Sequence, residues 1–366
     1  MPREILSFKK IYSDAEKIVT AKYDELLAED GKVYKDTMSG LWNVPLGYSN
    51  DNIKQSMMNQ LVKLPYTSNF SGYHSKTTEQ YAEIICKRTK MKRVYFTNSG
   101  SAAVETAIKL TGKNIAVCGK HSYHGSTILS ANASDQDINK FWGIQNPMSV
   151  YKFEDANDLI QIANGLYDMS FVIIEPVVGA GGVYSWSDDI WRVLKEYQDR
   201  GGIVIFDETV TGFGKLGTMF AFEKFNFDPD IIILGKGITN GYFPMGACLI
   251  NERIEKTIKM FNHGFTYSGH PVGCAAALET LKEIDKLELN HFQTDVATRQ
   301  YGCMGAIDFE TPKQSLTFIK KMREEGYILE DGSENVSTAV FCIPYIMQKQ
   351  DFDNFEETMK CIIKDM

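Results

Sequence analysis

The sequence contains seven cysteines, but it has no CxxC pair and no regular cysteine spacing. Zinc sites and disulfide frameworks are recognised by such spacing, so its absence argues against both. Reduced thiols instead favour a reducing compartment, and we expect a cytoplasmic protein.

Long apolar runs are also missing. Stretches such as Ile231–Leu234 are far too short to cross a bilayer, and Met1–Lys17 is dotted with charges and lacks the apolar centre of a secretory signal. Basic residues are outnumbered, 39 against 47 acidic ones, which gives a formal net charge of −8. Because phosphate backbones require a basic face, we expect neither a nucleic-acid partner nor a membrane partner.

The composition and the pattern of apolar runs indicate an α/β protein with a large core. The chain has 366 residues, of which 43% are hydrophobic. Short apolar runs predict strands, and stretches of helical periodicity lie between them. The predicted strands are 94–97, 115–118, 171–175, 203–207 and 231–234, and the predicted helices between them are 102–110 and 188–200. This alternation is typical of a mostly parallel sheet covered on both faces.

The two ends of the chain have a different pattern. Helices are predicted at 312–325 and 352–364, and strands at 304–309 and 338–344, which is an α+β pattern. We therefore predict a large domain at 46–280 and a small domain that residues 1–45 and 281–366 build together.

Chemistry-bearing residues follow the predicted strands directly, where open α/β sheets bind ligands. Ser99-Gly100-Ser101 opens a helix, and its free N–H groups and hydroxyls could hold a phosphate. A simple capped helix would have the same pattern. Tyr123 and His124 follow another strand, where an aromatic ring could stack on a flat heterocycle or belong to the core.

Two buried strands end in acids, at Glu175 and Asp207. A metal site would need a His or a third carboxylate beside them, and we predict no metal site. An Asp in this position can instead pair with a protonated pyridine nitrogen.

Lys236 stands between Gly235 and Gly237 directly after a buried strand. Burial and neighbouring cations lower the pKa of an amine, which makes it a nucleophile that can form a Schiff base. A lysine in an ordinary glycine-rich turn is the alternative for this residue alone. The phosphate cradle, the aromatic residue, the Asp and the Lys together indicate a cofactor site more specifically than any one of them does.

These segments, in this order, resemble the class-III (omega-type) aminotransferase family of fold type I, which depends on pyridoxal 5′-phosphate (PLP). Residues 207–215 resemble the DEV-x-TGFGR signature of that family, 229–247 its PD-x4-GK block, and 263–271 its HG-x-TY-x-GHP block. Residues 299–308 are similar to its VRG-x-GLM-x-GIE segment.

The resemblance implies that Lys236 forms the Schiff base and moves protons, that Asp207 pairs with the pyridine nitrogen, and that Glu175 is a supporting acid. It further implies that Tyr123 and Thr209 lie on the two faces of the ring. Thr266 would reach the cofactor phosphate of the partner subunit in a homodimer with shared active sites. The expected cofactor-binding residues are Ser99, Gly100, Ser101, Tyr123, His124, Asp207, Thr209, Lys236 and Thr266.

The chain departs from the family pattern in places. Lys215 replaces an Arg, and residues 286–298 are shorter than their counterpart. Trp42 occupies a position that lines the family's substrate pocket. Glu330 stands where many members carry an Arg that binds a substrate α-carboxylate, so we expect a preference for diamines or for basic amino acids that react at the distal amine. If Glu330 is instead at the surface, Arg299 could bind the carboxylate.

The predicted function is transfer of an amino group from a small-molecule amine donor to a carbonyl acceptor. A PLP-dependent racemase, aminomutase or decarboxylase on the same scaffold remains an alternative, because all of them use the Lys and the Asp. A non-catalytic PLP-binding relic is the third alternative, suggested by the shortened small domain.

Overall fold

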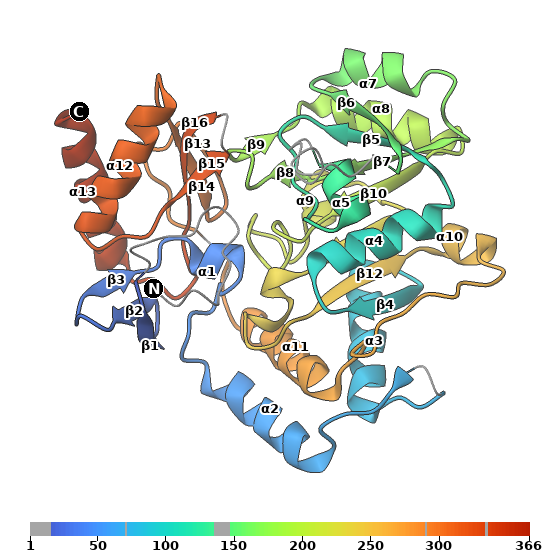
Figure 1. The fold of residues 1–366 in the computed structure, drawn as a ribbon, viewed down its shortest axis with the longest axis horizontal. Helices are drawn as coiled ribbons and strands as arrows, with labels where there is room; N and C mark the ends of the chain where they lie inside the picture. Colours follow the sequence, from blue (N-terminus) through green and yellow to red (C-terminus); the bar gives the residue numbers. More distant parts are fainter. Residues whose placement is uncertain (1–15, 70–71, 135–146, 290, 334–335) are drawn as a thin grey trace.

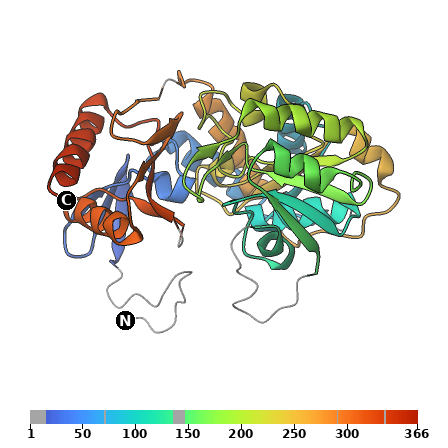
Figure 2. The ribbon, with the colours of Figure 1, turned by 90° about the horizontal axis from the view of Figure 1, so that it is seen from above.

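The computed structural model describes residues 16–69, 72–134, 147–289, 291–333 and 336–366. Two domains lie side by side, and their sheets are separate (Figures 1 and 2). The expected start of the small domain at residue 1 falls partly outside the described residues. No helix in the described ranges is long and apolar enough to cross a membrane.

The large domain is built on a seven-stranded sheet in the order β4-β12-β11-β10-β7-β5-β6. The pairs β10–β11, β10–β7, β5–β6 and β5–β7 are parallel, whereas β12 runs antiparallel to both β11 and β4. The strands are β4 (Arg93–Thr97), β5 (Ile115–Gly119), β6 (Ser149–Phe153), β7 (Ser170–Ile174), β10 (Ile203–Asp207), β11 (Ile231–Leu234) and β12 (Gly246–Ile250). The prediction of a mostly parallel sheet is confirmed, although β6 and β12 were not foreseen.

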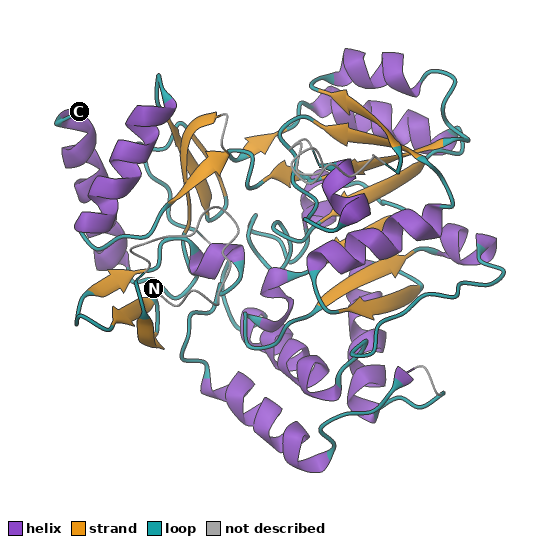
Figure 3. Ribbon diagram, viewed as in Figure 1, coloured by secondary structure: helices purple, strands orange, loops and turns teal. Residues whose placement is uncertain are grey.

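Both faces of this sheet are buried. Val204 and Phe206 of β10 contribute to one apolar cluster, whereas Ile203 and Ile205 contribute to another. The alternation follows from the two-residue period of a strand, and it explains why these strands are apolar at every position. Helices cover both faces (Figure 3). They are α2 (Asp51–Lys63), α3 (Lys76–Thr89), α4 (Gly100–Thr111), α5 (Ile128–Ala133), α7 (Ala156–Ala163), α8 (Asp188–Asp199), α9 (Ala221–Phe225), α10 (Glu252–Thr257) and α11 (Pro271–Ile284).

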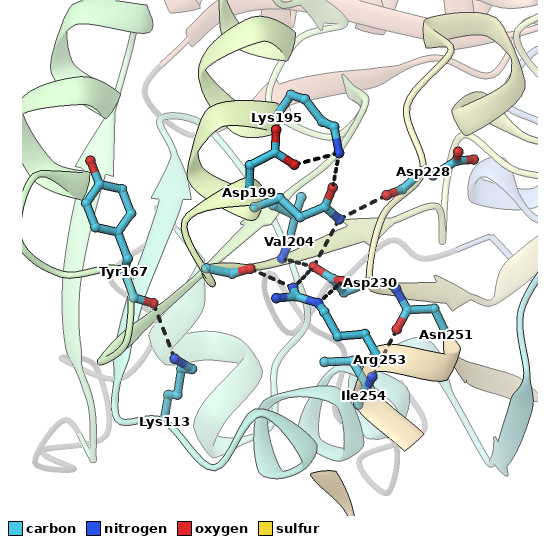
Figure 4. Close-up of polar contacts among 12 residues, drawn as sticks. Lys113, Tyr167, Lys195, Asp199, Val204, Asp228, Asp230, Asn251, Arg253 and Ile254 are labelled. Carbon is cyan, nitrogen blue, oxygen red and sulfur yellow. Dashed lines mark hydrogen bonds and ion pairs between the residues drawn. The ribbon is translucent and has the colours of Figure 1, made fainter. Parts of the chain in front are cut away.

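The amino ends of the central strands are held by Asp230, which is 1% exposed. Its carboxylate accepts hydrogen bonds from Val204 N at 2.9 Å, Asn251 Nδ2 at 3.0 Å and Arg253 Nε at 2.8 Å (Figure 4). Arg253 also donates to Gly202 O at 2.6 Å. This network fixes the edge of the sheet opposite to the carboxyl ends of β10 and β11.

The small domain contains segments from both halves of the chain, blue and red in Figure 1. Its antiparallel sheet has the order β13-β14-β16-β15, and α12 and α13 pack on it. A separate three-stranded meander, β1-β2-β3, joins it through Lys35 N, which donates to Gly326 O at 2.7 Å. The elements are β1 (Ile18–Lys22), β2 (Glu25–Ala28), β3 (Val33–Lys35), α1 (Ser39–Trp42), β13 (Arg299–Tyr301), β14 (Met304–Asp308), α12 (Pro312–Glu324), β15 (Glu330–Ser333), β16 (Val336–Cys342) and α13 (Lys349–Lys364).

A small hairpin connects the two domains. Its strands, β8 (Val177–Val178) and β9 (Tyr184–Ser185), leave the large sheet after β7. Val177 and Val183 are fully buried and belong to the apolar cluster of the small domain. The hairpin therefore belongs to the large domain in sequence and to the small domain in packing.

Candidate active site

The carboxyl ends of four strands bring the predicted residues together. Strand β4 points the same way as β11, because two antiparallel steps through β12 restore its direction. The segments after β4, β5, β10 and β11 therefore meet at one edge of the sheet. A Cβ added at Gly235 would lie 3.1 Å from Thr209 Cγ2 and 3.4 Å from Gly100 Cα. The lysine turn, the residue after Asp207 and the start of α4 are thus in contact.

The start of α4 has the features of a phosphate cradle. Ser99 is the N-cap, and its hydroxyl accepts a hydrogen bond from Ala102 N at 3.2 Å. Ser101 Oγ accepts one from Ser126 N at 3.2 Å, which ties the loop after β5 to this helix. A Cβ at Gly100 would lie 2.9 Å from Thr209 Cγ2, so a side chain would fill the space beside the helix start. The helix dipole and the free N–H groups favour an anion here.

Asp207 ends β10 and is 2% exposed. His124 Nδ1 lies 2.8 Å from its Oδ2, and Thr209 N donates to its Oδ1 at 3.0 Å. Two carboxylate oxygens offer about four acceptor positions, so Asp207 can accept a further hydrogen bond from a ring N–H. His124 and Thr209 thereby fix the placement of the carboxylate.

Glu175 is fixed by the backbone around it. Its Oε1 accepts a hydrogen bond from Tyr123 N at 2.9 Å, and its Oε2 accepts one from Gly179 N at 3.0 Å. Burial raises the pKa of Glu175, although His124 and these hydrogen bonds oppose the shift. Glu175 therefore positions Tyr123 as well as being an acid at the strand end.

Lys236 follows β11 and is half-buried. Burial lowers its pKa to about 8, and the charge of Lys215 acts in the same direction, whereas Glu175 and Asp207 raise it. A pKa near 8 leaves a usable neutral fraction of the amine at neutral pH, as a nucleophile and proton carrier requires.

Lys215, the residue that replaces an Arg, is fully buried. Its Nζ has no hydrogen-bond partner among the described residues, and a Cβ at Gly237 would lie 3.4 Å from it. Close to it, Cys303 Sγ and Cys342 Sγ are 3.6 Å apart. Both belong to the small domain, so Lys215 lies where the two domains meet behind Lys236. Nothing in the sequence signals this, since a lysine after a glycine suggests a surface turn.

The segment that carries Trp42 has an unusual backbone. Ser39, Gly40, Leu41 and Trp42 all have positive φ values, between 48° and 69°. Asp36 holds this left-handed turn by accepting hydrogen bonds from Met38 N at 3.0 Å and Gly40 N at 2.6 Å. The Trp42 side chain is 2% exposed and lies in the core of the small domain, whereas Leu41 is 58% exposed.

Arg299 is not free to bind a substrate carboxylate in this structure. It forms a fork-like ion pair with Asp308 and donates to Gly182 O at 2.9 Å. Its guanidinium also lies 4.1 Å from the centre of the Tyr184 ring. Glu330, at the start of β15, is half-buried and pairs with Val340 of β16.

Together these residues are the candidate site for a phosphorylated aromatic cofactor on an α/β sheet. The residues present fit pyridoxal 5′-phosphate. The Oγ1 of Thr209 and the Nε2 of His124 are buried without hydrogen-bond partners among the described residues, and a glycine stands at the start of α4, where a side chain would meet Thr209. This is the class of PLP-dependent enzymes of fold type I.

Comparison with known proteins identifies the family. The family model described as "Aminotransferase class-III" matches residues 17–297. The chain belongs to the class-III aminotransferase family.

Curated relatives include gamma aminobutyrate transaminase 3 of Solanum lycopersicum, which is 33% identical over 318 residues, covering 74% of this chain and 61% of that protein. Gamma aminobutyrate transaminase 2 of the same plant is 35% identical over 299 residues, covering 69% of this chain and 65% of the relative. The chain thus spans less than two thirds of these relatives' length.

Among solved structures, an amine transaminase from an uncultivated Pseudomonas species, in its PLP-bound internal aldimine form, has a TM-score of 0.88 and 25% identity. It covers 99% of this chain, and 98% of its own length is matched. A structure titled "Transaminase with L-ala" has a TM-score of 0.87 and 26% identity, with 95% of this chain and 98% of that one covered. The fold-type-I architecture predicted from the sequence is confirmed.

Proposed function

We propose that the protein is a PLP-dependent aminotransferase that moves an amino group from a small amine donor to a carbonyl acceptor. The observation that carries this proposal is the placement of Lys236, with a pKa of about 8, at the strand edge that also holds Asp207 and the start of α4. Family membership supports it.

Bound PLP supplies a carbonyl carbon that exchanges amines and a ring that accepts electrons. Lys236, neutral in part at neutral pH, would accept a proton from the donor's amine-bearing carbon and hold it for return. Asp207 would accept a hydrogen bond from the pyridine N–H and favour its protonated form, and His124 orients Asp207. Tyr123 and Thr209 would hold the ring, and Ser99, Gly100 and Ser101 would hold the phosphate.

Two measurements test this proposal. Borohydride reduction followed by peptide mass spectrometry should place the phosphopyridoxyl group on Lys236; a group on another lysine would contradict the assignment. With a donor and no acceptor, the enzyme should release one carbonyl product per bound cofactor and then stop. Racemisation or release of carbon dioxide under the same conditions would favour a racemase or a decarboxylase, and no reaction at all would favour a binding relic.

The proposed donors carry their reactive amine away from any α-carboxylate. Arg299 is engaged by Asp308, and Glu330 brings a negative charge where the family resemblance implies an Arg in many members. A carboxylate would repel a substrate α-carboxylate and attract a second ammonium group. Diamines or basic amino acids reacting at the distal amine are therefore the proposed substrates, and Trp42 and Glu330 stay the proposed pocket residues.

A comparison of donors tests the substrate proposal. A diamine such as putrescine should have a higher kcat/KM than alanine or glutamate, and Glu330→Gln should narrow the difference. The matched control Glu325→Gln changes an exposed residue at the end of α12. It should leave the order of the donors' kcat/KM values unchanged. If alanine or glutamate is preferred and Glu330→Gln has no effect, the charge argument is wrong.

We also place the active sites in a homodimer that shares residues between subunits. Thr266 is exposed, and it lies in an exposed aromatic surface in which the rings of Tyr66 and Tyr267 are 6.1 Å apart. Exposed aromatic clusters are typical of protein interfaces. A cavity of about 260 Å³ beside them is lined by His263 and Phe265, among others.

Subunit mixing tests the shared site. Lys236→Ala and Thr266→Ala chains should each have low activity, and refolding them together should restore part of it through hybrid dimers with one intact site. A fully active monomer in sedimentation at assay concentration would contradict the shared site.

The domain limits proposed are residues 1–45 and 281–366 for the small domain and 46–280 for the large one. The separate sheets support them. A cytoplasmic location is also proposed, supported by seven free cysteines, although similar proteins include chloroplastic and mitochondrial ones.

A further inference from the structure

Arg299 connects the small domain to the hairpin between β8 and β9. From β13 its Nη2 donates to Gly182 O at 2.9 Å, and its Nε lies 3.3 Å from both Gly182 O and Val183 O. The side chain is 17% exposed, and Asp308 holds the other side of the fork. A planar guanidinium that is bound on both sides has one possible orientation. The turn of the hairpin is therefore fixed by the small domain.

The turn has little freedom of its own. Val183 has a φ of 59°, a strained value for a β-branched residue, and its side chain is fully buried in the small domain. A Cβ at Gly332 of β15 would lie 3.3 Å from Gly182 Cα, so a second strand of the small domain also touches the turn. Such strain persists only where the surroundings enforce the conformation, and Arg299 supplies the hydrogen bonds that do so.

The hairpin in turn contacts the loop after β5. The Tyr184 ring, under the Arg299 guanidinium, stacks on His121 with 5.8 Å between ring centres. A Cβ at Gly181 would lie 2.0 Å from His121 O, so the two backbones are in direct contact. His121 has a φ of 62°, which makes its conformation dependent on this contact. Two residues later stands Tyr123.

Glu175 also links the hairpin to Tyr123, from within the large domain. Its carboxylate accepts hydrogen bonds from Tyr123 N and from Gly179 N of the hairpin, and Trp186 Nε1 donates to its backbone oxygen at 2.8 Å. Tyr123 is thus positioned by Glu175 from within the large domain and by the Arg299–Tyr184–His121 stack from the small domain.

We propose that Arg299 is a positioning residue for cofactor binding, which acts through Tyr184 and His121 to hold the Tyr123 ring in place. This inference rests on the proposed contact between Tyr123 and the cofactor ring. It gives Arg299 a role other than recognition of a substrate carboxylate, and it makes cofactor affinity depend on the docking of the small domain.

Arg253 provides a matched control. It too forms a fork with a carboxylate, that of Asp230, and donates to a backbone oxygen, that of Gly202 (Figure 4). It lies at the amino ends of β10 and β11, on the opposite edge of the sheet from Lys236. Arg299→Met and Arg253→Met therefore remove the same kinds of bonds, and only Arg299 is connected to Tyr123.

The test titrates each apoenzyme with PLP and follows the quenching of protein fluorescence, together with denaturant unfolding. Both Met variants should be less stable. Arg299→Met should raise the PLP dissociation constant about tenfold, the change expected when stacking worth ~1.4 kcal/mol is lost, and Arg253→Met should leave it within about twofold. Equal dissociation constants for the two variants would overturn the proposal.

Two further variants separate the possible failures. Tyr184→Leu removes the ring between Arg299 and His121 but leaves the pair with Asp308, so it should also weaken PLP binding, even if Arg299→Met does not fold. Tyr123→Leu should weaken binding, and adding Arg299→Met to it should cause no further loss. Normal binding by Tyr123→Leu would refute the proposed ring contact; weak binding by Tyr123→Leu beside normal binding by Arg299→Met would refute the inference alone.

Discussion

The buried amine of Lys236 should make the stability of the apoenzyme depend on pH in a defined way. Its pKa is about 8 in the folded chain, against an ordinary value of 10.5. Between these values the unfolded chain binds more protons at this residue than the folded chain does. The free energy of unfolding therefore rises with pH in this window, and the cost of burying the charge is largest below pH 8.

The magnitude follows from the shift. One pKa unit corresponds to about 1.4 kcal/mol, so ionised Lys236 costs about 3 kcal/mol at low pH. Between pH 7 and pH 9.5, a group with these two pKa values adds about 2 kcal/mol to the free energy of unfolding. Lys236→Met, which keeps the length of the side chain and removes the charge, should lose this contribution.

Urea unfolding of the wild-type and Lys236→Met apoenzymes at a series of pH values measures this contribution to the free energy of unfolding. The variant should be more stable than the wild type at pH 7, and its advantage should shrink by about 2 kcal/mol by pH 9.5. The variant Lys195→Met serves as the control, because the exposed side chain of Lys195 is in water before and after unfolding. A difference between wild type and Lys236→Met that stays constant from pH 7 to pH 9.5 would refute the shifted pKa, and with it the reason for assigning the nucleophile.

Three further predictions concern other residues. Asp207→Asn should retain PLP but slow amino transfer about 10²-fold or more, because an amide cannot keep the ring nitrogen protonated; a normal rate in a stopped-flow assay would contradict this role. Lys215→Met should raise the free energy of unfolding by about 1–3 kcal/mol, since the buried Nζ has no hydrogen-bond partner among the described residues, and a loss of stability in urea would show that its charge is compensated. Leu41→Gly should be about 1 kcal/mol more stable than Leu41→Ala, because φ is 61° there; equal midpoints would mean that the left-handed turn is not strained.

The sequence predicted the strand ends well, because apolar runs followed by a single polar residue have few other structures available. The positions of Asp207, Glu175 and Lys236 at strand ends could be predicted in this way, and the contact between their segments followed from the rule for parallel strands. The strand β12 was not predicted, and its antiparallel direction could not have been inferred, since a five-residue apolar strand has the same pattern in either direction.

Contacts between segments that lie far apart in the chain could not be predicted from the sequence either. The hydrogen bond between His124 and Asp207 joins residues 83 positions apart, and Arg299 contacts a turn 117 positions earlier. The left-handed turn at 39–42 contains a single glycine, so its backbone has no sequence signature; Asp36 and the small domain impose it. Such features depend on packing rather than on local preference.

Contacts between the two ends of the chain constrain the order in which the protein can fold during synthesis. Ser39 Oγ donates to Cys342 O, and Thr37 Oγ1 donates to Ile328 O, across separations of 303 and 291 positions. At about 5–20 residues per second, a ribosome needs about 15–60 s to make the chain between Ser39 and Cys342. The seven-stranded sheet has all its strands by residue 250, so it can form while Thr37 and Ser39 still lack their partners. During that interval Lys215 O, close to the Lys236 turn, lacks the hydrogen bond that Cys303 N donates in the folded protein, so the two domains can be joined only after the strands of the large sheet have been made.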